Sequence, residues 1–204
     1  MDSLLLAQVG DFAEGQFGQV TAEQAASVGV DLAELERAGF AEPVIDGVWR
    51  LRARGRHEFP RVYAAWLRLE PATAGWDRQV PASGVVSHGT ALRVYRVGDE
   101  AGYRPEFTTP TPMTSSAMVH TLNLDGTDWQ AVVGLPTTTP GRTLIDVAGR
   151  LDSDELGRII DGFVSGRWVT GPVLRADVTV RLRDMSNLGS EHRVLAELVA
   201  ALPG

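Results

Sequence analysis

The 204-residue chain contains no cysteine and no lysine, so all 19 of its basic residues are arginines. Without cysteine, disulfide bonds and thiolate chemistry are excluded. Without lysine, a nuclease centre that places lysine beside two carboxylates cannot be built in its usual form. The sequence also lacks a glycine-rich phosphate-binding loop, which argues against the common nucleotide-binding motifs.

Long hydrophobic runs are absent as well. The first segment, MDSLLLAQVGDF, has only a short apolar run and no basic flank, so neither a signal peptide nor a membrane span is expected. A hydrophobic content of 44% is ordinary for a globular chain and allows a packed core. We therefore expect a cytoplasmic protein without membrane contacts, built from one large or two small domains.

Positive charge is scarce in the first part of the chain. Residues 1–49 hold nine acidic side chains and one arginine, whereas residues 50–70 hold six arginines and two glutamates. The whole chain has a net charge of −7, and a net-negative protein does not gather on DNA through its overall charge. Any contact with nucleic acid must come from a local patch, and the candidate patch begins at Arg50.

Local signals predict three helices followed by a β-hairpin. Residues 3–13 have apolar positions at helical spacing, Thr21 begins a capping-box pattern, and Asp31 is a good N-cap for a third helix. Two β-like runs then flank Asp46-Gly47, which is a strong signal for a hairpin. This order predicts a winged helix-turn-helix that ends near residue 56.

The second strand of that hairpin carries arginine at every second position. A strand with this period places all four arginines on one face, with Trp49, Leu51 and Ala53 toward the core. Guanidinium groups match phosphate oxygens, so the row predicts contact with the DNA backbone; the alternative is a solvated face that offsets nearby acidic helices. The residues of this row are Arg50, Arg52, Arg54 and Arg56.

The third helix occupies the position of a DNA-reading helix but is acidic. Its exposed residues are expected to be Ala33, Glu34, Glu36 and Arg37. Arg37 can pair with guanine, and a carboxylate can accept from cytosine, but carboxylates near the backbone are repelled by phosphate. We therefore expect DNA binding to be modest and salt-sensitive.

The remaining residues predict a second domain. Pro60 opens a helix, the turn-rich segment PATAGWDRQVPASG (71–84) is typical of a linker, and GVVSHGTALRVY fits a strand or a helix. The fold class is therefore a two-domain α+β or α/β protein, with a winged helix-turn-helix and trailing helix in residues 1–70 and a mixed α/β domain in residues 85–204. Further expected strands lie around Glu106–Thr108, Val119–Leu124 and Trp129–Val133, and further helices follow caps at Thr139, Asp152 and Ser190, with another starting at Gly171-Pro172.

Two short motifs in the second domain contain its candidate interaction residues. Ser87 and His88 are adjacent, but neighbours on a strand point to opposite faces, so a buried, hydrogen-bonded histidine is favoured over a catalytic pair. Arg142 and Asp146 are four apart on a predicted helix and can form an ion pair, in a structural or a binding role. The four histidines show no metal-ligand spacing, so no metal site is predicted. No cofactor and no catalytic residue are predicted either.

Several strings in this order resemble the AbiEi family of antitoxins from abortive-infection toxin–antitoxin systems. They are GVWRL, VVSHGTAL, GLPTTTPGRTLIDVA and ELGRIIDGFV, and the resemblance spans roughly residues 10–168. It implies a phage-defence antitoxin whose winged helix represses its own promoter and whose second domain opposes a nucleotidyltransferase-like toxin. The wing matches this pattern at Arg50 and Arg52, whereas the third helix departs from it.

Two other readings stay open at the level of sequence. One is a protein-interaction module whose winged helix no longer binds DNA, which the acidic third helix favours. The other is a degenerate nuclease-like enzyme of related α/β build, which the missing lysine opposes.

Overall fold

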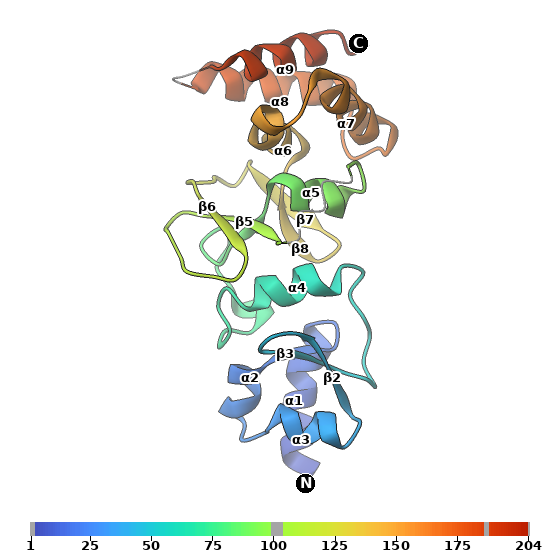
Figure 1. Cartoon of the computed structure of the whole chain (residues 1–204), viewed down its shortest axis with the longest axis vertical. Helices are drawn as coiled ribbons and strands as arrows, with labels where there is room; N and C mark the ends of the chain where they lie inside the picture. Colours follow the sequence, from blue (N-terminus) through green and yellow to red (C-terminus); the bar gives the residue numbers. More distant parts are fainter. Residues whose placement is uncertain (1–2, 99–103, 186–187, 204) are drawn as a thin grey trace. The chain divides into compact units, whose positions relative to one another are not determined.

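The structure is a computed structural model that describes residues 3–98, 104–185 and 188–203. Helices and sheets are organised in two compact units, and the predicted mixed α/β composition is confirmed (Figure 1). The first unit comprises the chain up to Gly84 together with Thr114–Ala117, and the second comprises Val85–Met113 and Met118–Gly204. Within the described ranges, no helix has the length and apolar character needed to cross a bilayer.

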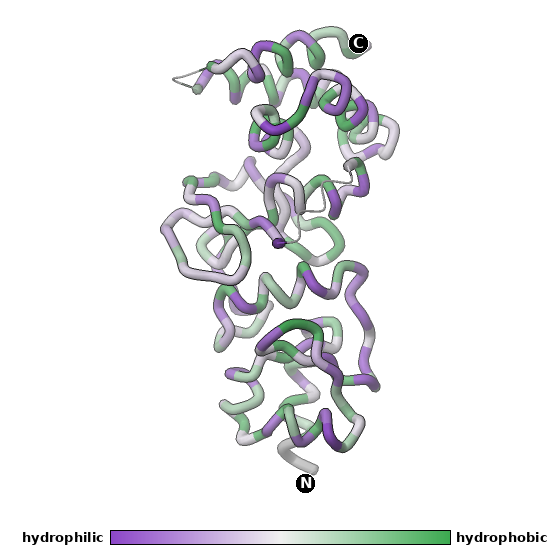
Figure 2. The backbone as a smooth tube through the Cα atoms, in the orientation of Figure 1, coloured by the Kyte–Doolittle hydropathy of each residue, from purple (hydrophilic) through white to green (hydrophobic). Residues whose placement is uncertain are grey.

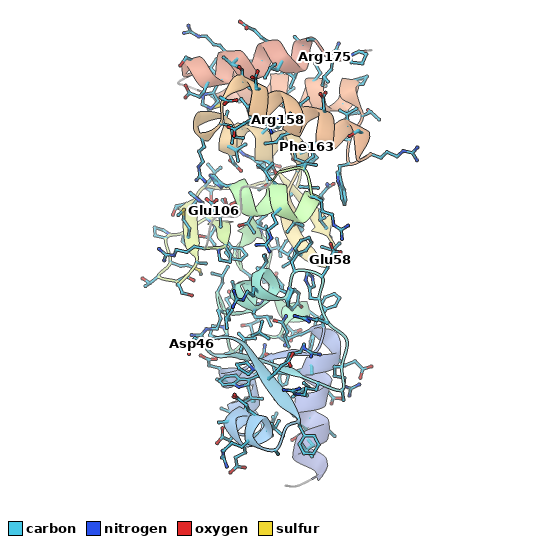
Figure 3. All side chains as sticks on the ribbon, turned by 45° about the vertical axis from the view of Figure 1, so that its right-hand side comes forward. Asp46, Glu58, Glu106, Arg158, Phe163 and Arg175 are labelled. Carbon is cyan, nitrogen blue, oxygen red and sulfur yellow. The ribbon has the colours of Figure 1, made fainter. Side chains whose placement is uncertain are left out.

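The first unit contains a small antiparallel sheet in the strand order β1-β3-β2, so β3 pairs on both sides. The Asp46-Gly47 turn joins β2 to β3 as predicted, and Gly47 has a φ of +74°, which glycine adopts without steric cost (Figure 3). The elements are α1 (Ser3–Gly15), β1 (Gln19–Thr21), α2 (Ala22–Ser27), α3 (Leu32–Arg37), β2 (Ala41–Ile45), β3 (Val48–Leu51), α4 (Pro60–Leu67) and the short 3₁₀ helix η1 (Gly75–Asp77).

Side-chain caps start two helices of the first unit where the sequence predicts them. Thr21 accepts a hydrogen bond from the backbone of Gln24, whose side chain accepts one from the backbone of Thr21, which completes the capping box. Asp31 caps α3 by accepting from the backbone of Ala33. Leu32 and Leu35 then face inward, and the core that they join is formed by α1, α2, α3 and the sheet: Val9, Ala13, Val20, Ala25, Val30, Leu32, Leu35 and Ala41.

Residues 71–84, the predicted linker, lie within the first unit and pack against α4. Arg78 is buried there, and its guanidinium lies 4.4 Å from the ring centre of Trp66. It donates hydrogen bonds to the carbonyl groups of Trp66, Leu67 and Glu70, which satisfies the end of α4. Burial lowers the pKa of Arg78 to about 10, so the side chain keeps its charge at neutral pH.

The second unit is built on a five-stranded mixed sheet in the order β6-β5-β4-β8-β7. The pairs β4/β8 and β5/β6 are parallel, and the pairs β4/β5 and β7/β8 are antiparallel. The segment GVVSHGTALRVY, for which the sequence allowed a strand or a helix, contains both: β4 ends at Val86 and α5 begins at His88. The elements are β4 (Val85–Val86), α5 (His88–Tyr95), β5 (Glu106–Thr109), β6 (Met118–Thr121), β7 (Trp129–Val132), β8 (Leu135–Thr138), α6 (Pro140–Val147), η2 (Ala148–Arg150), α7 (Ser153–Ser165), α8 (Gly171–Asp184) and α9 (Ser190–Ala200).

Helix α7 buries the face that its apolar spacing predicts, and hydrophilic and hydrophobic residues alternate along the helices that follow the sheet (Figure 2). Asp152 and Glu155 form a capping box at the start of α7. Phe163 of α7 is fully buried and meets the edge of Tyr95 from α5, with 5.2 Å between ring centres (Figure 3). The remaining inward residues of α7 are the predicted Leu156, Ile159 and Ile160.

Two expected boundaries in this unit are wrong. Strand β6 ends at Thr121 rather than near Leu124, because its partner β5 ends at Thr109, the residue that pairs with Thr121. Gly189, not Ser190, is the N-cap of α9. Thr139 precedes α6 as predicted, but its side chain makes no capping hydrogen bond.

Candidate functional site

The arginine row predicted for the hairpin is not a continuous strand face. Strand β3 ends at Leu51, and a turn and loop carry the chain onward, so the period of two is lost after Arg50. Ala53 is consequently exposed instead of facing the core. Trp49 and Leu51 do pack against the core, as predicted. The prediction of four arginines on one strand face is therefore wrong, because only Arg50 lies within β3.

Carboxylates hold three of these four arginines. Glu42 of β2 lies opposite Arg50 and accepts two hydrogen bonds from it, at 2.9 and 2.6 Å, and lies 3.6 Å from Arg52. The hydrogen bonds from Arg50, with the charge of Arg52, lower the pKa of Glu42. Arg54 pairs with Glu14 of α1 at 3.1 Å. Arg50, Arg52 and Arg54 therefore offset the charge of acidic neighbours, which is the alternative that the sequence left open.

The arginine of helix α3 also lies near a carboxylate. Arg37 lies 3.9 Å from Glu34, with both side chains more than half exposed, so the pair is loose. Glu36 accepts a hydrogen bond from the indole of Trp49 at 2.7 Å, which ties the helix to the central strand β3. Its carboxylate thus has a local structural partner that the sequence did not indicate.

The second unit brings together His88, Glu106 and His120, which we call the His–Glu–His cluster. Glu106 and Thr108 are two apart on β5 and share one face of the sheet, and His120 lies opposite Thr108 on the edge strand β6. His88 enters from the first residue of α5. One side-chain ligand atom from each of the three residues lies within 4.8 Å of the others. Figure 3 shows Glu106 among the strands of the sheet.

Ser87 and His88 are hydrogen-bonded to each other, which corrects the prediction that their side chains point apart. Ser87 is the N-cap residue of α5 rather than a strand residue, and His88 has a φ of +50°. This backbone turn brings Nδ1 of His88 to 2.9 Å from Oγ of Ser87. Thr108 donates to the same Oγ at 2.9 Å, so a chain of hydroxyl groups orients the imidazole. The ring of His88 stacks on that of His120, with 3.7 Å between centres and a 19° tilt.

Glu106 is the charge centre of the cluster. Its side chain is 8% exposed, and Arg150 from η2 donates to both carboxylate oxygens at 3.0 and 2.9 Å. His120 Nε2 lies 2.8 Å from Oε2. Burial alone would raise the pKa of Glu106, but the hydrogen bonds from His120 and Arg150 outweigh it and lower the pKa to about 2. Glu106 is therefore ionised at neutral pH.

The surroundings of His88 favour its uncharged form, whereas those of Glu106 favour its charged form. Burial, with the neighbouring His120, lowers its pKa to about 3. The imidazole is therefore neutral at physiological pH and has a ring nitrogen available as an acceptor or ligand. A neutral histidine beside an ionised glutamate is the protonation state required for binding a metal ion.

Arg142 and Asp146 form the i,i+4 ion pair that the sequence suggests, with Arg142 Nε 2.9 Å from Asp146 Oδ1. The Asp146 side chain is 5% exposed, and burial raises its pKa even though Arg142 opposes that rise. The charges of this pair also act on the cluster, because Arg142 lowers the pKa of His88. All four candidate residues of the two sequence motifs are thus near or within one buried polar region.

Sequence reasoning missed Glu106, His120 and Arg150, and it did not anticipate that two histidines and a glutamate come together in a group that could hold a metal ion. These residues are separated by 14 and 30 positions and come from β5, β6 and η2, so no short spacing links them. The one signal in the sequence was a charged residue, Glu106, at the start of an expected strand; in the structure all four residues of that strand, EFTT, are buried. A buried charge needs a partner, which points to a site.

Comparison with known proteins adds no family assignment: no protein-family model matches the chain, and no curated protein matches it significantly. The AbiEi resemblance accordingly stays a prediction that rests on the sequence strings.

Proposed function

We propose that the chain is an antitoxin-like regulator of the AbiEi type. In this proposal the first unit is a winged helix-turn-helix that binds DNA of its own promoter. The second unit binds and opposes a nucleotidyltransferase-like toxin without catalysing a reaction itself. The protein would act in the cytoplasm as a transcription repressor within an abortive-infection system.

The arrangement of the first unit is the observation that carries this proposal. Helices α2 and α3 are joined by a short turn, and α3 leads directly into the hairpin β2–β3. Strand β1 completes a three-stranded sheet beside them. This order of helix, turn, helix and hairpin supports a winged helix, with α3 in the position that enters a DNA groove.

The ion pairs decide which arginines would contact DNA in this proposal. Arg50 has only 15% of its side chain exposed and is held by Glu42, so it is a poor phosphate ligand. Arg52 has 58% of its side chain exposed, and Arg56 is exposed in the following loop. Arg37 on α3 has 71% of its side chain exposed. We therefore assign phosphate contact to Arg52 and Arg56, with Arg37 of α3 as a third exposed arginine.

A binding titration over a range of salt concentrations tests this assignment. The probe is duplex DNA from the region upstream of the coding sequence. The double variant Arg52→Ala/Arg56→Ala is expected to bind about tenfold more weakly and to reduce the salt slope by about one unit for each lost phosphate contact. Arg193→Ala, an exposed arginine on α9, is the matched control and should leave both unchanged.

A second candidate is a protein-interaction module whose winged helix does not bind DNA. The pairing of Arg50 and Arg52 with Glu42 and of Arg54 with Glu14 favours it, because these carboxylates already neutralise the surface that DNA would need. Wild-type protein that shows no DNA binding at low salt, yet captures the product of a neighbouring nucleotidyltransferase-like gene, would favour this candidate. Loss of both activities would reject the antitoxin proposal.

A further inference from the structure

The His–Glu–His cluster has the donor set of a three-ligand metal site. Two imidazoles and one carboxylate are the ligands of many zinc sites with an open fourth position. The 2.8 Å between His120 Nε2 and Glu106 Oε2 is close to the separation of two ligand atoms on one ion, about 3 Å for bonds of about 2 Å. Since its Nδ1 faces Ser87, His88 has Nε2 left for an ion.

We infer that His88, Glu106 and His120 bind one Zn²⁺ ion in the second unit. The surrounding residues supply the outer contacts that such sites use. The hydroxyl of Ser87, itself bonded to Thr108, orients the His88 ring. Outer partners of this kind fix the ligand atoms and tune affinity. This site is independent of DNA binding and of the antitoxin role.

Two features of the cluster limit the affinity and make the inference testable. The stacked rings must tilt apart before both can direct a nitrogen at one ion; His120 can move because it lies on edge strand β6 with 26% of its side chain exposed. The guanidinium of Arg150 competes with a cation for the Glu106 carboxylate. Loss of that competition should therefore strengthen zinc binding.

Metal binding by the full-length chain can be measured calorimetrically with Zn²⁺ and by visible absorption with Co²⁺ as a spectroscopic substitute. One ion per chain is expected. His120→Gln and Glu106→Gln should each weaken binding at least about tenfold, the lower end of the loss caused by changes around metal sites. Arg150→Gln should tighten it about fivefold, because a competing positive charge is removed. His192→Gln, a histidine on α9 outside the cluster, should behave as wild type.

A tighter-binding Arg150→Gln is a result that general unfolding cannot produce. Imidazole nitrogen NMR of wild-type protein gives a second readout without any variant: Zn²⁺ should shift the resonances of His88 and His120 and leave those of His57 and His192 in place. The inference is overturned by wild-type protein that takes up no Co²⁺ at a tenfold excess, by shifts confined to His57 or His192, or by unchanged zinc affinity in folded His120→Gln.

Discussion

Each unit contains a carboxylate held by arginine, and the two carboxylates are in different surroundings. Glu42 in the first unit has 32% of its side chain exposed and meets the half-exposed Arg52 as well as Arg50. Glu106 in the second unit is 8% exposed and is bonded to Arg150 and His120. Water solvates and screens the first group, whereas the second depends on its protein partners.

The difference in exposure means that similar ion pairs have different effects in the two units. Exposed pairs contribute little to stability, so those of the hairpin mainly set the local charge that DNA would meet. The buried group cannot lose a partner without leaving a charge or a polar atom unsatisfied. The second unit should therefore be sensitive to single substitutions at its polar residues, and the hairpin should not.

Glu106→Gln is expected to have the largest effect on stability. It leaves Arg150 without its carboxylate and replaces two charge-assisted hydrogen bonds by weaker ones, with an expected loss of about 3 kcal/mol in the free energy of unfolding. Urea unfolding followed by circular dichroism measures the loss. Glu197→Gln, an exposed glutamate on α9, is the control and should stay within about 0.5 kcal/mol of wild type. Equal values for the two variants would remove the contrast between buried and exposed carboxylates.

Asp146→Ala should follow, with an expected cost of about 2 kcal/mol, because it strands the guanidinium of Arg142, which is 17% exposed. The cost is smaller than for Glu106 because burial raises the pKa of Asp146, so part of the gain from the ion pair is already offset. Asp146→Asn keeps the volume and an acceptor oxygen and should cost less than Asp146→Ala. The same unfolding measurement decides the order, and a more damaging asparagine would contradict it.

His88 makes the second unit sensitive to mild acid. Its pKa falls from the usual 6.5 to about 3 on folding, so between these values the unfolded chain binds a proton that the folded chain does not. Stability is fully present above pH 6.5 and declines as the pH falls. Between pH 6.5 and 5, wild type should lose roughly 1–2 kcal/mol more than His88→Gln. Parallel pH curves for the two proteins would show that His88 does not titrate in this way.

Local signals predicted much of the fold because their causes are local. The caps at Thr21, Asp31 and Asp152, and the Asp46-Gly47 turn, depend on residues a few positions apart, and all four are present. The inward face of α7 likewise follows from spacing within one helix.

The candidate site was not predictable in the same way. Its geometry depends on the parallel pairing of β5 with β6 and on a positive φ at His88, neither of which has a short-range signature. The arginine row failed for a related reason: the end of β3 at Leu51 is set by its pairing with β1 and β2, not by the alternation of arginines. The spacing of the arginines therefore predicted a continuous binding face on β3, although the chain leaves the strand after Leu51.

Arg54→Ala should have the smallest effect and tests the exposed side of the comparison. Its partner Glu14 has 71% of its side chain exposed, and Arg54 itself has 40%. Solvent screens the attraction, and ordering two long side chains opposes it, so the free energy of unfolding should change by no more than about 0.5 kcal/mol. A double-mutant cycle with Glu14→Ala isolates the energy of the pair from the other effects of removing either side chain. A coupling energy above about 1 kcal/mol would mean that this hairpin is rigidly held by its ion pairs, and the hairpin could not then be treated as a solvated surface whose charges are free to rearrange toward DNA.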